Sequence, residues 1–205
     1  GARAAAEHAW NLARRDVDVR ATAEVLAPLL LADGDLDQAA DVLARAQRAE
    51  EALGDLAEAG RSAATRAEVL LDGDRAEDAA SAAFAATDLF LAAGEVSLAS
   101  WARLSAARAF RACDRDQNAA DLLEELLERA AEDGDRELEG AAALELAGLL
   151  GDFGLFDDAL PMAERAVRAF GPEHGAGRAK AHRRLALVHE ALGKIPDAVA
   201  AGVSC

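Results

Sequence analysis

The chain has 205 residues, of which 52% are hydrophobic and 4% aromatic, and its formal net charge is −16. The hydrophobic fraction excludes a disordered chain, and the negative charge argues against nucleic-acid binding, which depends on neutralising phosphates with Lys and Arg. No uncharged apolar run of about 18 residues is present, so we expect no membrane-spanning helix. Two cysteines, Cys113 and Cys205, are too few for a disulfide framework, which predicts a cytoplasmic protein.

A 40-residue repeat organises the sequence. Alanine recurs with this period in two series, which are Ala27, Ala67, Ala107, Ala147 and Ala186, and Ala39, Ala79, Ala119, Ala159 and Ala198. Both series advance by 40 residues at each step except the last, which is 39. A fixed period of this size is typical of solenoids, in which each unit packs only against its neighbours.

The repeat divides the chain into helical hairpins. Residues 1–15 contain an amphipathic helix at 2–14 that aligns with the second helix of the later repeats, so we expect a half-unit there. Five repeats are predicted to follow, at 16–54, 55–94, 95–134, 135–177 and 178–205. The fourth includes a break at Gly171–Gly177, and the fifth is short. We therefore expect the chain to be a fragment of a longer, bacterial protein, since its abundant Ala, Gly and Arg are typical of a GC-rich genome.

Turn signals support this division. Gly54, Gly94 and Gly134 are each followed by an acidic residue and are predicted to end the second helices. Within the repeats, Asp35, Asp74 and Asp114 are each followed three residues later by Gln or Glu, which predicts capping boxes. Pro28 lies inside the first helix of its repeat and is expected to kink or shorten that helix.

These units resemble tetratricopeptide repeats. The resemblance lies in two helices per unit, a small residue in the middle of the first helix, and a Gly-x-aromatic-x-x-Ala-Leu motif, best preserved at Gly154–Leu160. It implies an all-α, right-handed α–α superhelix of about five hairpins plus the N-terminal helix. The period exceeds the usual ~34 residues, as in a long-helix variant. HEAT repeats of similar length are an alternative, although they favour a regular first-helix proline and only Pro28 fits.

The resemblance also implies where a partner binds. First helices in this family line a concave groove that holds a peptide or a partner helix. In the repeat at 95–134, this groove would be lined by residues on one helix face, namely Trp101, Leu104, Arg108, Arg111 and Arg115. The other repeats would add Arg61 and Glu68 from the second, Leu144 from the fourth, and Lys180 and Arg183 from the fifth.

Three arginines beside a tryptophan form a candidate anion site. Arg binds carboxylates in bidentate fashion, so we expect the partner to present an acidic segment or a C-terminal carboxylate. The alternative is that these arginines pair with acidic residues of the second helix, which are Asp121, Glu124, Glu125 and Glu128.

The sequence thus predicts a protein–protein interaction scaffold, as part of a bacterial regulator or adaptor. The alternative is a self-association module that forms a homodimer through the terminal helices at 2–14 or 178–205. No catalytic motif, cofactor loop or metal-ligand set is recognisable. His182 and His189 are too far apart for a metal pair. We therefore expect neither an enzyme nor a cofactor.

Overall fold

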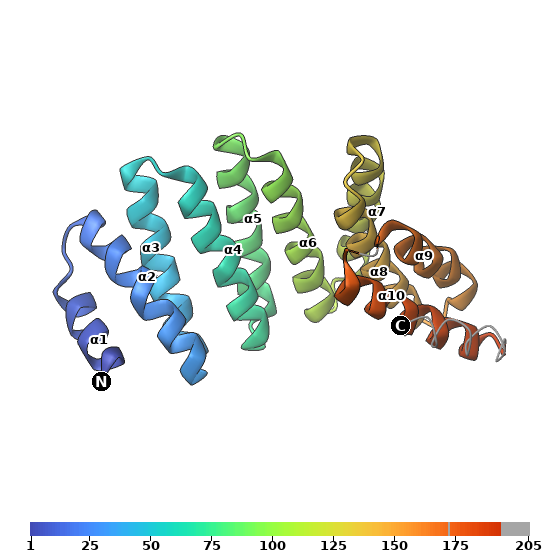
Figure 1. Cartoon of the computed structure of the whole chain (residues 1–205), viewed down its shortest axis with the longest axis horizontal. Helices are drawn as coiled ribbons and strands as arrows, with labels where there is room; N and C mark the ends of the chain where they lie inside the picture. Colours follow the sequence, from blue (N-terminus) through green and yellow to red (C-terminus); the bar gives the residue numbers. More distant parts are fainter. Residues whose placement is uncertain (172, 194–205) are drawn as a thin grey trace. The chain divides into compact units, whose positions relative to one another are not determined.

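The computed structural model describes residues 1–171 and 173–193. In this part the chain forms ten α-helices and no strand, which confirms the all-α prediction (Figure 1). They are α1 (Ala2–Leu12), α2 (Asp16–Asp33), α3 (Leu36–Leu53), α4 (Leu56–Asp72), α5 (Ala76–Ala92), α6 (Val96–Ala112), α7 (Asp116–Asp133), α8 (Arg136–Asp152), α9 (Phe156–Ala169) and α10 (Gly175–Ala191). The second helix expected in the fifth repeat lies outside the described residues.

The helices alternate between two positions in the repeat. We call α2, α4, α6, α8 and α10 the first helices, and α1, α3, α5, α7 and α9 the second helices. The helices α2, α4, α6 and α8 begin at residues 16, 56, 96 and 136, at intervals of 40. The helix α10 begins at Gly175, so the break expected at Gly171–Gly177 is shorter than the sequence suggests.

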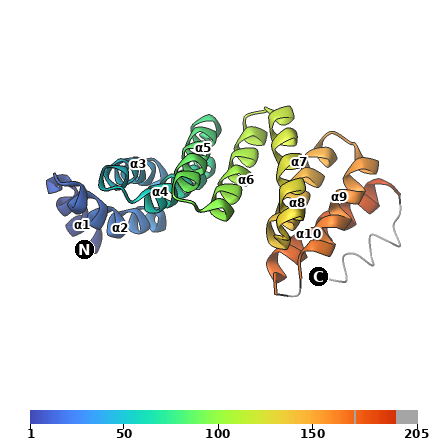
Figure 2. The ribbon, with the colours of Figure 1, turned by 90° about the horizontal axis from the view of Figure 1, so that it is seen from above.

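The chain divides into two compact units, an N-terminal unit (1–114) and a C-terminal unit (115–205). In the N-terminal unit, each helix from α1 to α5 packs against the next helix in chain order, so that the series ends with α6 (Figure 2). In the C-terminal unit, α8 contacts α7, α9 and α10, and α9 also packs against α10. The helices α6 and α7 belong to different units, so the continuous solenoid over 1–205 stays a prediction.

The turns between repeats follow the glycine signal. Gly54 and Gly134 end α3 and α7 in the left-handed conformation, with φ of 81° and 71°. This conformation costs a glycine little, because it has no Cβ to meet the carbonyl oxygen. The backbone N–H of Gly54 donates to the Glu51 carbonyl at 3.0 Å, and that of Asp55 donates to the Glu50 carbonyl at 2.9 Å. These bonds satisfy carbonyls at the helix end.

The predicted capping boxes are wrong. Asp74 and Asp114 lie one residue before the N-cap positions and adopt left-handed backbones, with φ of 57° and 56°. Asp35 is at an N-cap, but its side chain makes no capping hydrogen bond. In contrast, Asp135 caps α8, because its Oδ1 accepts a 3.0 Å hydrogen bond from the Leu138 backbone N–H. At two of the three turns, the acidic residue of the acid-x-x-Glu/Gln pattern therefore lies one residue too early to cap the helix.

Pro28 does not shorten α2, which continues to Asp33. A proline removes the hydrogen bond to the carbonyl four residues earlier, which here belongs to Glu24. Both Pro28 and Glu24 are exposed, so water can reach that carbonyl. The cost of the missing hydrogen bond is small, because the Glu24 carbonyl lies on the solvent-facing side of the helix.

The packing of first against second helices depends on pairs of a small and a large residue. Phe90 of α5 is 3% exposed, and a Cβ on Gly60 of α4 would lie 2.7 Å from its Cδ1 atom. In the C-terminal unit, Phe170 is 7% exposed, and a Cβ on Gly140 of α8 would lie 3.0 Å from its Cδ2 atom. In each pair the phenylalanine follows the glycine by 30 residues. The ring thus rests on bare backbone, which lets the two helices approach closely.

Replacing Gly60 with alanine tests this packing. The new methyl group would force Phe90 to shift, which costs about 1–3 kcal/mol, against a gain of up to about 1 kcal/mol in helix propensity. We expect Gly60→Ala to lower the free energy of unfolding, measured by urea denaturation.

Gly151→Ala is the matched control. Gly151 is also helical, but the nearest atom that its Cβ would meet is Arg184 Nη1 at 3.9 Å. This substitution should leave the free energy of unfolding unchanged or raise it slightly. Equal stabilisation by both substitutions would show that Phe90 does not rest on Gly60.

Candidate functional site

The residues predicted in the third repeat do not form one exposed stripe. Leu104 is completely buried, at 0% exposure, so its assignment to the groove is wrong and its side chain is part of the core. Trp101, Arg108 and Arg111 of α6 are half-buried. Arg115 is exposed, but it belongs to the C-terminal unit. The i, i+3, i+4 spacing marked a shared helix face, but part of that face is used for packing.

The arginines predicted to form the anion site already interact within the protein. Each of Arg108, Arg111 and Arg115 takes part in at least one such interaction. In α4, Arg61 Nε donates a 3.0 Å hydrogen bond to Glu58 Oε2, and Arg61 Nη2 contacts the other carboxylate oxygen. A carboxylate from a partner would therefore compete with existing contacts at these positions.

The structure brings three of the predicted residues together in the C-terminal unit. Leu144 of α8 and Lys180 and Arg183 of α10 line one pocket of about 350 Å³, together with Glu145, Arg184 and Leu187. Lys180, Arg183 and Leu187 are exposed. We call this the α8–α10 pocket. Its three cations outnumber its one carboxylate, and its leucines supply apolar walls, so it suits an acidic side chain next to an apolar one.

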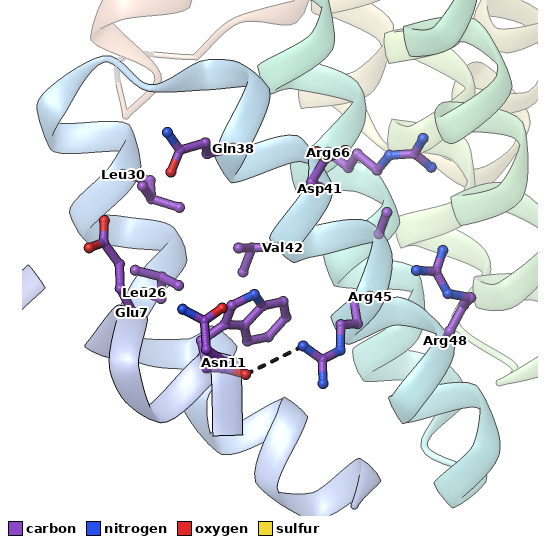
Figure 3. A pocket seen from close by; sticks show the side chains of 12 residues that line it. Glu7, Asn11, Leu26, Leu30, Gln38, Asp41, Val42, Arg45, Arg48 and Arg66 are labelled. Carbon is purple, nitrogen blue, oxygen red and sulfur yellow. Dashed lines mark hydrogen bonds between the residues drawn. The ribbon is translucent and has the colours of Figure 1, made fainter. Parts of the chain in front are cut away.

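A larger pocket in the N-terminal unit was not predicted from the sequence. It has a volume of about 790 Å³ and is lined by second helices α1 and α3, with contributions from α2 and from Arg66 of α4 (Figure 3). Glu7 and Asn11 of α1 lie opposite Arg45 of α3. Sequence reasoning missed it because it looked for a site only on the first helices.

Arg45 has a structural role at this pocket. Its guanidinium carbon lies 4.4 Å from the centre of the Trp10 ring, within the range of a cation–π contact. Its Nη2 donates a 2.6 Å hydrogen bond to the Ala13 carbonyl, and its Nη1 donates a 3.4 Å bond to the Trp10 carbonyl. A cation is favourable at a helix C-terminus, where the helix dipole is negative. Arg45 therefore attaches α1 to α3.

Other kinds of site are not supported by the described residues. Within 1–171 and 173–193, no group of three or more His, Cys, Asp or Glu side chains could hold a metal ion. The thiol of Cys113 is half-buried and lies 3.5 Å from the Phe110 carbonyl oxygen. No helix in the described part of the chain is long and apolar enough to span a membrane.

Comparison with known proteins gives matches only among solved structures. No protein-family model matches the chain, and no curated protein does. BtubC from P. vanneervenii has a TM-score of 0.78 at 20% identity, covering 99% of this chain and 87% of its own. The TPR-like repeats of a putative kinesin light chain from Podosopora anserina reach 0.68 at 19% identity, covering 92% and 93%. RapI in its apo form reaches 0.78 at 12% identity, covering 92% of this chain and 53% of its own.

Arg45→Ala tests the attachment of α1. The substitution removes a cation–π contact and two hydrogen bonds to carbonyls, together about 1–3 kcal/mol. We expect amide hydrogen exchange in residues 2–12 to accelerate by roughly ten- to a hundredfold.

Arg48→Ala is the control, because Arg48 lines the same pocket but is exposed. It should leave exchange in α1 unchanged. If exchange in α1 is equally slow in both variants, Arg45 does not hold this helix.

Proposed function

From the fold, which the chain shares with tetratricopeptide-like repeat proteins, we propose a protein–protein interaction scaffold. The partner is a peptide or a helix bound along the exposed surface of the first helices. The scaffold is part of a bacterial regulator or adaptor and acts in the cytoplasm. The proposal includes no catalytic role.

The observation that carries the proposal is the α8–α10 pocket. It lies between two successive first helices, where a groove is expected from the fold. It also combines exposed cations with exposed leucine, the composition that gives binding energy and orientation together. Arg184 adds a third cation that the sequence analysis did not include.

The charge of this pocket defines the partner. The chain as a whole carries −16, whereas the pocket has Lys180, Arg183 and Arg184 against Glu145. An acidic partner segment would be repelled elsewhere and attracted here, which gives specificity as well as affinity. We therefore propose that the pocket binds an acidic side chain or a C-terminal carboxylate. Trp101, Arg108, Arg111, Arg61 and Glu68 of the N-terminal unit and Arg115 of the C-terminal unit are proposed as further partner-binding residues, each within its own unit.

Self-association is the second candidate, because apolar side chains are exposed near the N-terminus. Leu12 is 62% exposed and Val17 is 49% exposed. A copy of the chain that covered them would form a homodimer. Light scattering across a range of concentrations distinguishes this candidate, since only self-association gives a mass that rises with concentration.

A charge-reversal variant tests the proposed site. Lys180→Glu/Arg183→Glu should still fold, because both side chains are exposed. We expect it to bind at least about tenfold more weakly to the protein that the wild type captures from a bacterial lysate. Overlapping peptides of that protein should locate the bound segment, which we expect to be acidic.

Arg48→Glu/Arg168→Glu is the matched control, with the same change in charge on exposed residues of second helices. It should bind like the wild type. Equal binding by the two double variants would show that the α8–α10 pocket is not the site.

A further inference from the structure

Glu50 occupies a position that other repeats give to apolar residues. At intervals of 40 residues, the equivalent positions hold Trp10, Phe90, Ala130 and Phe170. Glu50 is nevertheless 5% exposed, as buried as the two phenylalanines at 3% and 7%. Burying a carboxylate costs several kcal/mol unless a cation or hydrogen bonds compensate for the lost water.

The first repeat also differs at the position that holds glycine in two other repeats. Gly60 and Gly140 lie against Phe90 and Phe170, and 30 residues separate the members of each pair. The residue 30 positions before Glu50 is Arg20. The first repeat therefore has an Arg–Glu pair where two other repeats have a Gly–Phe pair, and the simplest expectation is an ion pair between them.

In the structure, Arg20 pairs with other carboxylates. Its Nη1 donates a 2.5 Å hydrogen bond to Oδ2 of Asp55, and its Nε lies 3.8 Å from Oε1 of Glu24. Glu50 receives a hydrogen bond from the Ser62 side chain. Its Oε2 atom is buried and has no hydrogen-bond partner among residues 1–171 and 173–193. One buried carboxylate oxygen of Glu50 thus lacks a hydrogen-bond donor in this part of the chain.

The charges around Glu50 do not fully compensate for the burial of its carboxylate. Burial raises the pKa of Glu50, the Ser62 hydrogen bond opposes the rise, and repulsion by Glu58 adds to it. Attraction to Arg20 lowers the pKa, and Glu24 raises it. Glu58 itself stays ionised, because hydrogen bonds from Arg61 lower its pKa. The cations near Glu50, Arg20 and Arg61, are thus already bound to other carboxylates.

Glu50 also lines a pocket between α2 and α4. The pocket has a volume of about 240 Å³, which suits one extended side chain rather than a folded element. We call it the α2–α4 pocket. It contains Glu24, Glu50 and Glu58 against one cation, Arg20. Ala23, Ala27 and Leu31 supply apolar wall along which the methylene stem of a long side chain could lie.

We propose that the α2–α4 pocket binds the cationic side chain of a lysine or arginine in a partner peptide, with the carboxylate of Glu50 as its counter-charge. The proposal rests on the proposed function, because it takes the ligand to be a peptide bound along the first helices. The incoming cation compensates for the burial of the carboxylate. It also assigns the N-terminal unit a preference opposite in charge to that of the α8–α10 pocket.

Peptide libraries with one fixed central residue test the proposal. Three libraries of eleven-residue peptides carry Lys, Arg or Gln at the centre and random residues elsewhere. They are passed over immobilised wild type, Glu50→Gln and Glu51→Gln. Glu51 is the matched control, since it neighbours Glu50 but is exposed. Thermal melting confirms that each variant folds.

We expect the wild type and Glu51→Gln to retain the Lys or Arg library about tenfold more than the Gln library. Glu50→Gln should lose this preference. A preference that persists in Glu50→Gln, or none in the wild type, would overturn the proposal. In either case the proposed function stands if the wild type still binds its captured partner through Lys180 and Arg183.

The buried carboxyl also predicts a pH effect on stability. In the folded protein the pKa of Glu50 lies above 4.5, the ordinary value, which applies in the unfolded chain. At a pH between the unfolded and the folded pKa, the folded state keeps a proton that the unfolded state has released. The stability of the wild type must then fall as the pH rises through this interval. The charged groups that face Glu50 are Glu24, Glu58, Arg20 and Arg61, and both variants contain all four.

Glu50→Gln removes this dependence. Relative to the wild type, its melting temperature should be higher at about pH 7 than at about pH 4. Glu51→Gln should show no such change with pH. A difference between Glu50→Gln and wild type that is constant with pH, or reversed, would mean that Glu50 is not held in a site that disfavours its charge.

Discussion

In two repeats, the packing depends on close contact between a glycine on a first helix and a phenylalanine 30 positions later, which lies near or just after the end of a second helix. Only 4% of the residues are aromatic, so a few rings carry much of the packing in a chain otherwise rich in alanine. Phe90 and Phe170 meet that need, because Gly60 and Gly140 offer bare backbone. Around Phe90, Ala63, Ala86, Ala99 and Ala102 complete a buried core of small side chains.

The first repeat is an exception, because its residues at these positions are proposed to serve binding rather than packing. Arg20 and Glu50 replace a glycine and an aromatic residue, and the buried carboxylate oxygen has no donor in the described residues. Natural proteins keep such unfavourable groups where a ligand compensates for them, at some expense of stability. The two first-helix pockets then differ in sign, acidic in the N-terminal unit and basic in the C-terminal unit. We propose that the first binds a basic side chain and the second an acidic one.

Much of the fold follows from the sequence, because the 40-residue period can be counted directly and the turn glycines act locally. Gly54 and Gly134 end their helices as predicted, and the tetratricopeptide-like fold is confirmed. The capping boxes failed because Asp74 and Asp114 adopt left-handed backbones, which the pattern does not reveal. Leu104 failed because helical spacing cannot tell a groove from a core. The oddity of Glu50 was visible in the 40-residue series, but its burial and its unpaired oxygen needed the structure.

The melting temperature of Arg20→Gly/Glu50→Phe, compared with that of the wild type, tests most directly whether Glu50 is kept for a ligand. The double variant restores the glycine–aromatic pair and removes the buried carboxyl, so it should melt roughly 3 °C or more above the wild type. It should also lose the preference for lysine or arginine peptides. A double variant that melts at or below the wild type would show that the Arg20 and Glu50 pair stabilises the fold, which contradicts a carboxylate held in place for a partner.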